Sequence, residues 1–327
     1  MRGLHLGKFL VPALVAAVFA ICSVAQTEQY GVVHGWPVIP DGYVLGQVSG
    51  VAVDSHNHVF VFHRAEGSWA ADKTKPIASP TILCFEGASG KLVASWGENR
   101  FLEPHGLRVD RDDNVWVTDR GLQQVFKFSH DGKLLLTIGT ARVAGWDATH
   151  FDKPTDIAFA ADGGVYISDG YGNSRVAKFS GDGKFQFEWG RKGTAPGEFD
   201  LPHSVAVDKN GLVYVADRSN ARIQVFDANG TFLKMWKSAE LGRPWTIAVG
   251  SDNRLYVVDG GDLKPVPPDR GQILKLDLDG NILAKWSRFG NYDGQIYWGH
   301  AISVGRDGAV YIGDVYHGMR VQKFVPR

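Results

Sequence analysis

This sequence of 327 residues contains little cysteine and has no excess of positive or negative charge. Lys plus Arg and Asp plus Glu both number 35, so no net basic field exists to gather phosphates, and nucleic-acid binding is not expected. Apolar residues make up 44% and charged residues 21%, which excludes a mainly disordered chain. Two cysteines cannot provide a disulfide framework, so a hydrophobic core must stabilise the fold.

The long apolar run is confined to the N-terminus. Two basic residues precede an apolar stretch over residues 9–24, which is shorter than the ~20 residues of a membrane-spanning helix. Ser23 and Ala25 then stand three and one residues before a cleavage point, as in a secretory signal peptide. We therefore expect residues 1–25 to be a signal peptide, residues 26–327 to form the folded domain, and the protein to be secreted or periplasmic. The alternative is an uncleaved membrane anchor.

The most prominent feature of the sequence is a repeated motif. A short apolar strand, a polar turn, a second strand ending in Asp and a third strand recur, as in GLRVDRDDNVWVTDRGLQQVFKFS from Gly106. A fourth strand such as FQFEWG from Phe185 closes most copies. Six copies at a period of roughly 46 residues fit four-stranded propeller blades. The repeats resemble NHL repeats, and we predict an all-β, six-bladed β-propeller.

The two ends of the chain are expected to share one blade. The last copy stops at its third strand, residues 320–324, and the missing fourth strand is predicted at residues 30–36, where YGVVHGW resembles FQFEWG. This pairing would close the ring and remove an exposed edge, so a monomer is expected. Two insertions, residues 65–80 and 263–271, are expected to be surface loops that shape one face.

One position near the start of each copy carries a chemical signal. Histidine stands there in the second, fourth and sixth copies, as His105, His203 and His300. Alternate blades lie about 120° apart and their first strands begin beside the axis, so the three imidazoles should converge. Three neutral nitrogen donors with a fourth position open are typical of a catalytic zinc site. A single histidine of this kind is more often a core residue, and the threefold repetition is what favours a metal.

Candidate catalytic residues are expected at the same rim. Arg64, Arg120 and Arg218 stand at or just after second strands, and Tyr171 takes the equivalent place in the third copy. A phenol beside a metal and a guanidinium would have its anion stabilised and could act as a general base, while an arginine could orient a substrate carboxylate. The alternative for Tyr171 is an aromatic residue at the rim without a catalytic role. The alternative for the arginines is that they form solvent-exposed ion pairs. His63 stands beside Arg64 in a strand, and the sequence leaves its role undecided.

The acidic residues that end the second strands have a simpler interpretation. They occupy one repeat position, where a carboxylate can accept hydrogen bonds from a turn or a neighbouring strand. These residues are Asp119, Asp169, Asp217, Asp259 and Asp314.

Several motifs give the sequence a resemblance to the peptidyl-α-hydroxyglycine α-amidating lyase family, over most of the expected mature chain. They are PHGL from Pro104, PTDIA from Pro154, SDGYGNSR from Ser168, LPHS from Leu201 and FHR from Phe62. The resemblance implies zinc held by the three histidines, Tyr171 as the base, and Arg64 and Arg218 lining the site. The implied reaction splits a peptide or small molecule ending in α-hydroxyglycine into a primary amide and glyoxylate, without a redox cofactor.

The resemblance also implies a structural calcium, and here the sequence departs from the pattern. The family binds that ion through two backbone carbonyls, which match Val51 and Leu107, and through an aspartate directly after the third histidine. The aspartate position is Ala301 in this chain. Because Ca²⁺ prefers several oxygen ligands that include a carboxylate, calcium is doubtful.

Two other classes of function stay open. The first is a non-catalytic secreted propeller that binds a ligand or a protein partner. Tyr171, Arg64 and Arg218 argue against it, because a closed structural metal site needs none of them. The second is a propeller hydrolase such as a lactonase or an esterase. Known propeller lactonases resemble one another in an axial calcium with Glu, Asn and Asp ligands, which histidines in alternate blades fit poorly.

Overall fold

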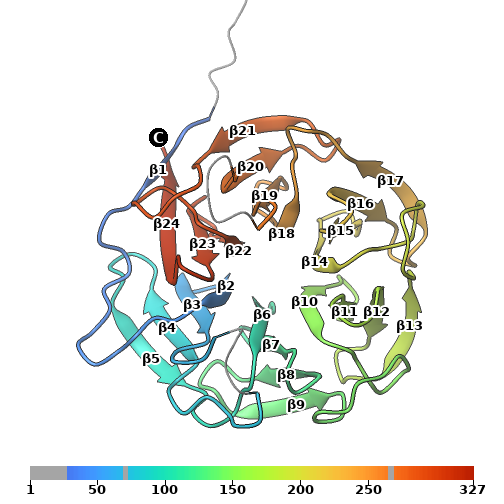
Figure 1. The fold of residues 1–327 in the computed structure, drawn as a ribbon, viewed down its shortest axis with the longest axis horizontal. Helices are drawn as coiled ribbons and strands as arrows, with labels where there is room; N and C mark the ends of the chain where they lie inside the picture. Colours follow the sequence, from blue (N-terminus) through green and yellow to red (C-terminus); the bar gives the residue numbers. More distant parts are fainter. Residues whose placement is uncertain (1–27, 69–72, 264–268) are drawn as a thin grey trace, which may run out of the picture.

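The computed structural model describes residues 28–68, 73–263 and 269–327. Within these ranges, 24 strands form six four-stranded sheets that are arranged as blades around a common axis (Figure 1). The prediction of an all-β, six-bladed propeller is confirmed. The predicted signal peptide and parts of both predicted insertion loops, residues 69–72 and 264–268, lie outside the described residues. Among those that are described, no helix is long and apolar enough to cross a membrane.

The strands take four places in a blade, from the axis outward. The innermost strands are β2 (Val48–Val53), β6 (Pro104–Val109), β10 (Pro154–Phe159), β14 (Pro202–Val207), β18 (Pro244–Val249) and β22 (Gly299–Val304). The second strands are β3 (His58–His63), β7 (Val115–Asp119), β11 (Val165–Asp169), β15 (Val213–Asp217), β19 (Leu255–Asp259) and β23 (Val310–Asp314). The third strands are β4 (Ile82–Glu86), β8 (Gln124–Phe128), β12 (Arg175–Phe179), β16 (Arg222–Phe226), β20 (Gln272–Leu276) and β24 (Arg320–Pro326). The outermost strands are β5 (Leu92–Trp96), β9 (Leu134–Ile138), β13 (Phe185–Trp189), β17 (Phe232–Trp236), β21 (Ile282–Trp286) and β1 (Tyr30–Val32).

Burial within a blade follows the amino-acid pattern. The second strands are rich in Val, Ile and Tyr and are buried on both faces, because each lies between two neighbouring blades. The outermost strands β13 and β17 alternate between partly buried and exposed residues, as expected for a sheet face in water. Gly183 and Gly230 close the turns before these strands at φ of 85° and 80°, a left-handed conformation that glycine adopts at no steric cost.

The hydrophobic core is divided among the seams between blades. At the seam between the first and last blades, Val51 and Leu83 pack in one cluster with Tyr311 and Val321. Comparable clusters join the other neighbouring blades. Each seam therefore holds two adjacent blades at a fixed angle around the axis, which fixes where the first residues of the innermost strands point.

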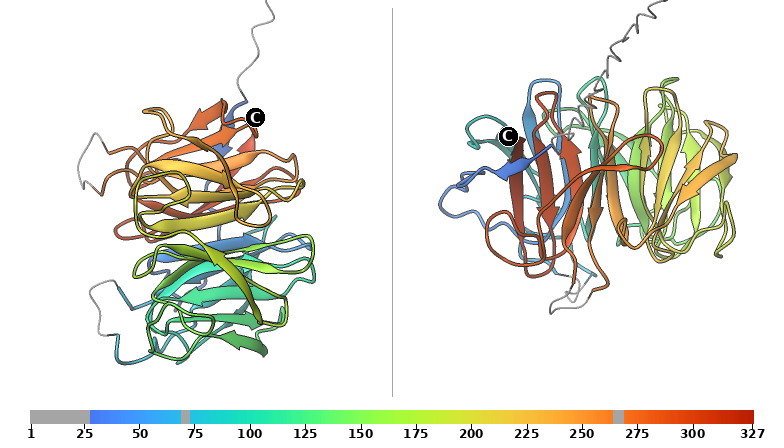
Figure 2. Two further views of the ribbon diagram at one scale, coloured as in Figure 1. Left: turned by 90° about the vertical axis from the view of Figure 1, so that its right-hand side faces the viewer. Right: turned by 90° about the horizontal axis from the view of Figure 1, so that it is seen from above.

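The N-terminal strand closes the ring, as predicted. β1 pairs antiparallel with β24, with Tyr30 opposite Pro326 and Val32 opposite Phe324. The strand is shorter than the predicted span of residues 30–36, and Trp36 instead packs against the ring of Tyr311 at a centroid distance of 5.0 Å. Figure 2 shows β1 beside the C-terminus at the rim of the propeller.

A candidate metal centre and active site

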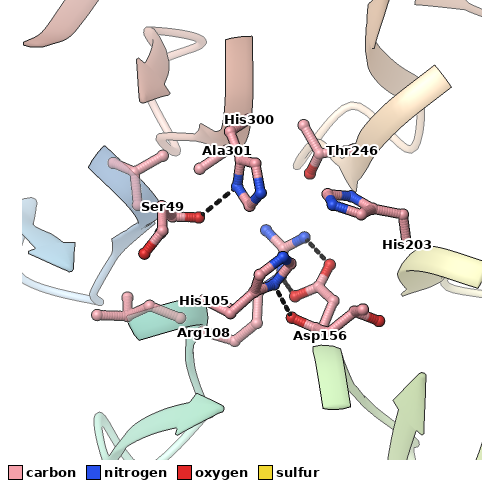
Figure 3. A pocket seen from close by; sticks show the side chains of 13 residues that line it. Ser49, His105, Arg108, Asp156, His203, Thr246, His300 and Ala301 are labelled. Carbon is pink, nitrogen blue, oxygen red and sulfur yellow. Dashed lines mark hydrogen bonds and ion pairs between the residues drawn. The ribbon is translucent and has the colours of Figure 1, made fainter. Parts of the chain in front are cut away.

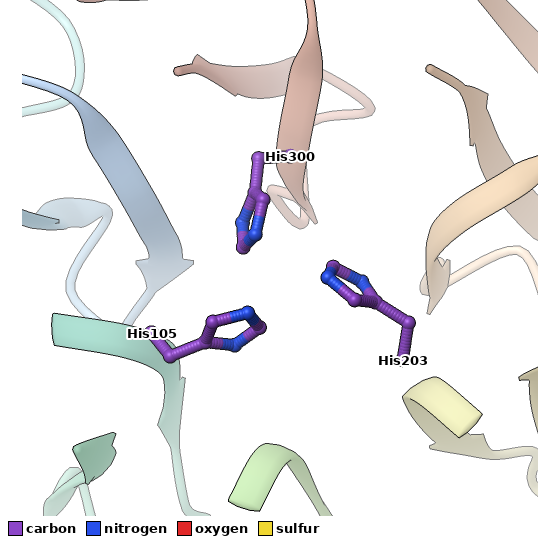
Figure 4. Close-up of side chains that lie close together, drawn as sticks. All are labelled: His105, His203 and His300. Atoms are coloured by element: carbon purple, nitrogen blue, oxygen red, sulfur yellow. The ribbon is translucent and has the colours of Figure 1, made fainter. Parts of the chain in front are cut away.

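The innermost strands are bulged where the predicted metal ligands stand. His105, His203 and His300 fall at breaks in the pairing register with the second strand of their blades. A bulge takes a residue out of the ladder and re-aims its side chain. All three imidazoles point toward the axis and one another (Figure 4).

The three histidines lie close enough to hold one ion. One ring nitrogen from each lies within 4.8 Å of the others, and ring centroids are 4.5 to 4.9 Å apart. Each residue is at most 3% exposed. The structure thus brings together the three residues that the repeat position predicted.

Backbone carbonyls determine which nitrogen of each ring is available. Each Nδ1 lies near a carbonyl oxygen of the following blade: 2.7 Å from Thr155 for His105, 2.6 Å from Trp245 for His203, and 2.8 Å from Ser49 for His300. Because a carbonyl only accepts, each Nδ1 must donate a proton, and the Nε2 lone pairs are free for a metal. Burial, reinforced by nearby cationic side chains, holds the pKa of all three well below 6.5, so the rings are neutral.

A metal ion fits this arrangement. The Nε2 atom of His300 is buried and has no hydrogen-bond partner among the residues that the structure describes. A buried polar atom in this state is costly unless another group binds it. Coordination of an ion would remove that cost, and neutral imidazole is the protonation state that binds metals.

Tyr171 and Arg218 stand at the same nitrogens. The Tyr171 hydroxyl lies 3.0 Å from Nε2 of His203 and 3.4 Å from Nε2 of His105. Arg218 donates from Nη1 to that hydroxyl oxygen at 3.3 Å. The phenol is therefore placed between the candidate metal ligands and a cation.

The Arg218 guanidinium is buried without a counter-charge. The residue is 7% exposed, and no carboxylate of the described residues lies within 4.0 Å of its guanidinium. Its Cζ lies 3.5 Å from the ring centroid of Trp245, a cation–π contact. Burial lowers the pKa of Arg218, partly offset by Tyr171. An unpaired buried cation is expensive, and such groups are expected where a ligand supplies the missing charge.

Two further arginines complete the rim. Arg64 is 1% exposed, and burial lowers its pKa to about 10 despite the opposing effect of Glu103. It donates from Nε to the carbonyl of Pro104, directly before the first histidine. Arg120, to which the resemblance gives no role, lies with its Cζ 3.9 Å from the ring centroid of Tyr171 and pairs with Glu103 at 3.4 Å. All predicted site residues on the rim are thus gathered around Tyr171.

The aspartates at the ends of the second strands hold the histidine-bearing segments in place. Asp119 accepts the backbone amide of Glu103, Asp217 that of Asp200, and Asp314 those of Tyr297 and Trp298, each just before a metal-ligand position. All five repeat aspartates are 0% exposed. Their interpretation as hydrogen-bond acceptors is confirmed.

The residues expected to bind calcium do not fit that ion. Val51, Leu107 and Ala301 line a cavity of about 10 Å³ next to the histidines (Figure 3). Ala301 offers no carboxylate, and the carboxylate that does reach this cavity, Asp156, is paired with Arg108 at 2.6 Å. A guanidinium thus already supplies positive charge here.

Arg108 was missed at the sequence level although a signal was present. Its guanidinium also donates to the carbonyls of Ile302 at 2.9 Å and Ile247 at 3.0 Å, so it connects β6 with β10, β18 and β22. At the same repeat position the other blades carry Ala or Ser. A single large cation among small residues facing the axis would have identified it.

Comparison with known proteins places the chain in a family. The NHL repeat model matches residues 101–128, 151–179 and 199–226. Peptidyl-alpha-hydroxyglycine alpha-amidating lyase 2 of Drosophila melanogaster is 32% identical, over 90% of this chain and 75% of its own length. The chain belongs to the peptidyl-α-hydroxyglycine α-amidating lyase family. The predicted carbon–nitrogen lyase class is confirmed at the level of this family.

Other family relatives are larger proteins. Peptidyl-glycine alpha-amidating monooxygenase B of Xenopus laevis is 38% identical over 89% of this chain, and the chain spans about a third of that relative, 35%. Among solved structures, the gluconolactonase XC5397 of Xanthomonas campestris aligns with a TM-score of 0.62 at 14% identity, covering 87% of this chain and 88% of that one. At that identity the likeness shows the propeller fold alone, and the reaction has to be inferred from the residues of the site.

Proposed function

We propose that this protein is a zinc-dependent lyase that cleaves peptidyl- or N-acyl-α-hydroxyglycine into a primary amide and glyoxylate. The observation that carries the proposal is the convergence of three Nε2 lone pairs beside the hydroxyl of Tyr171. Three neutral imidazoles form a ligand set that suits zinc and leaves a coordination position open. Membership of the lyase family supports the reaction.

The arginines would bind the carboxylate of the substrate. A hydroxyglycine unit ends in a carboxylate next to the hydroxylated carbon, and the buried Arg218 guanidinium can supply charge-assisted hydrogen bonds to it. Arg64 adds positive charge that acts on His105 and His300. Binding the carboxylate between these cations would bring the hydroxyl group of the substrate to Tyr171.

Tyr171 would carry the proton. In its anionic form it removes the proton from the substrate hydroxyl, and the released electron pair forms the carbonyl of glyoxylate as the carbon–nitrogen bond breaks. The departing amide nitrogen takes up one proton, which Tyr171 can return, so atoms and charge balance without water or a redox cofactor. The hydrogen bond from Arg218 stabilises negative charge on the phenolic oxygen. Bound zinc would act as a Lewis acid that polarises an oxygen of the substrate.

Glyoxylate release tests the proposal. Purified protein should hold zinc and release glyoxylate from N-benzoyl-α-hydroxyglycine, and His203→Ala should lose metal and turnover together. Tyr171→Phe should keep the metal and lose about 10²–10⁴-fold in kcat. Tyr292→Phe is the matched control, because that tyrosine is 80% exposed. Zinc binding without glyoxylate release from any hydroxyglycine would contradict the lyase and favour a binding propeller.

We propose that the protein is exported, on the basis of the signal-peptide pattern in residues 1–25 alone. N-terminal sequencing of the protein recovered outside the cytoplasm should begin at Gln26. An intact Met1 on membrane-bound protein would instead establish an uncleaved anchor.

A further inference from the structure

A second group of metal-ligating side chains lies away from His105, His203 and His300, which we call the channel histidines. Asp54 follows β2, His58 begins β3 of the same blade, and His130 lies in the turn between β8 and β9 of the next blade. Oδ2 of Asp54 lies 2.9 Å from Nδ1 of His58 and 2.8 Å from Nε2 of His130. One ligand atom from each residue lies within 4.8 Å of the others, so three nitrogen and oxygen donors converge on one point.

The carboxylate of this group is fixed in orientation. Oδ1 of Asp54 accepts the backbone amides of His56 at 2.8 Å and His58 at 2.7 Å. Oδ2 is thereby aimed at the two imidazoles, and the side chain of Asp54 is 0% exposed. Hydrogen bonds that hold a carboxylate in place also prepare it as a metal ligand, because it need not reorient on binding.

Solvent reaches the group from the side of the imidazoles. The side chains of His58 and His130 are 31% and 43% exposed, so an ion can enter and water can complete its coordination. His56 stands beside them, with ring centroids 6.1 Å from His58 and 6.4 Å from His130. A third imidazole is therefore close to the same point, at the solvent side.

The equivalent aspartates of other blades have different hydrogen-bond partners from Asp54. At the position of Asp54, Asp110 of the second blade is satisfied by Asn114 and Trp116, and Asp208 of the fourth blade by Tyr214. Histidine takes the partner positions only at the seam between the first two blades of the described structure. The imidazole of His130 arrives from 76 residues along the chain, so local turn geometry does not explain the meeting.

We propose that Asp54, His58 and His130 form a second binding site for a divalent metal of the zinc, nickel or cobalt type. Two imidazoles and one carboxylate suit these borderline ions. Each ring would present its inward nitrogen to the ion and carry its proton on the other nitrogen. The site lies at the far end of β2 from Ser49, whose carbonyl holds His300, about 16 Å away for a strand of this length.

Such an ion would link two blades. It would tie the turn after β2 to the turn after β8, across a seam that side-chain packing and the hydrogen bonds from Ser55 to Asp113 also hold. Binding to the folded state alone stabilises that state in proportion to the logarithm of metal concentration over Kd. The site is therefore expected to act on stability and to leave glyoxylate release unchanged.

Metal counting on protein without a histidine tag tests the proposal. After treatment with a chelator and dialysis against ZnCl₂, the double variant His58→Gln/His130→Gln should hold one zinc fewer per chain than the unaltered protein. His34→Gln is the control, since His34 also pairs with a single carboxylate, Asp293 at 2.8 Å, and should lose none. Zn²⁺ should raise the Tm of the unaltered protein more than that of the double variant.

The outcome does not depend on the channel site. In a His203→Ala background the difference of one zinc between the two forms should persist. An equal zinc content with and without His58 and His130 would overturn the proposal, provided that circular dichroism shows both forms folded. In that case the group is only a set of hydrogen bonds from two imidazoles to the Asp54 carboxylate.

Discussion

At the scale of single residues, three backbone carbonyls decide what the channel histidines can do. Each takes the Nδ1 proton of one ring and leaves Nε2 toward the axis. The same carbonyls belong to the equivalent residues of the alternate blades, so the propeller repeat itself orients the ligands. Rotation of any ring would break its hydrogen bond to the carbonyl, which favours the observed orientation; the Thr155 carbonyl also accepts a hydrogen bond from the Thr118 hydroxyl at 3.0 Å.

Arg218→Leu tests the carboxylate-binding role. The variant keeps an apolar contact with Trp245 and loses the charge, so kcat/KM should fall by about 10²-fold, the worth of one or two charge-assisted hydrogen bonds. Competitive inhibition by glyoxylate should weaken by a similar factor, while zinc content stays the same. Arg191→Leu is the control, because Arg191 pairs with Glu198 and its side chain is 79% exposed. Unchanged inhibition by glyoxylate in Arg218→Leu would rule out the role.

His63 is a structural residue with a consequence for pH. Its Nδ1 accepts the amides of Gly46 and Ala65, and burial lowers its pKa from 6.5 to about 4. The unfolded chain therefore takes up a proton near pH 6.5 that the folded chain takes up only near pH 4, so stability falls as the pH drops through this window. At pH 5 the loss should be about 2 kcal/mol relative to pH 7. Urea unfolding should show a smaller loss for His63→Gln, and equal losses would contradict this assignment.

At the scale of elements, one side chain joins the innermost strands across the axis. Arg108 reaches from β6 to Asp156 on β10 and to carbonyls on β18 and β22. Removal of one partner from a buried ion pair leaves the other uncompensated, so Arg108→Ala should cost about 3–5 kcal/mol in the free energy of unfolding. The double variant Arg108→Ala/Asp156→Ala should be less destabilised than the sum of the single variants, by urea unfolding. Strict additivity would mean that the pair is not coupled.

The repeat explains which parts of the site were predictable. The three histidines, Tyr171 and Arg218 stand at repeat positions whose place in a blade is known once a propeller is assigned, so their convergence could be predicted. The carbonyl acceptors and the Arg108–Asp156 pair depend on contacts between different blades, which a reading of single repeats does not contain. His58 and His130 meet for the same reason, across one seam.

At the scale of the whole molecule, the ring is closed by non-covalent contacts between its two ends. Trp36 lies just after β1, is 7% exposed and packs against Tyr311 and Phe85, so it joins the last blade to the first. Trp36→Ala should destabilise the protein by about 3–5 kcal/mol in urea unfolding, as for other large cavities in cores. Trp146→Ala, at a tryptophan 44% exposed, should cost much less. Similar losses in both variants would show that closure does not limit stability.

The guanidinium of Arg108 turns the axis of the ring into a blind pocket. Arg108 lines both the small cavity beside the histidines and the larger cavity at the far end, and about 10 Å³ on the histidine side has room for a single water. In the proposed reaction, a substrate that enters beside Tyr171 could therefore not pass through, and both products would have to leave by the opening through which the substrate arrived. In that reaction, the product whose carboxylate the buried arginines bind would leave last and would block the next substrate until it does.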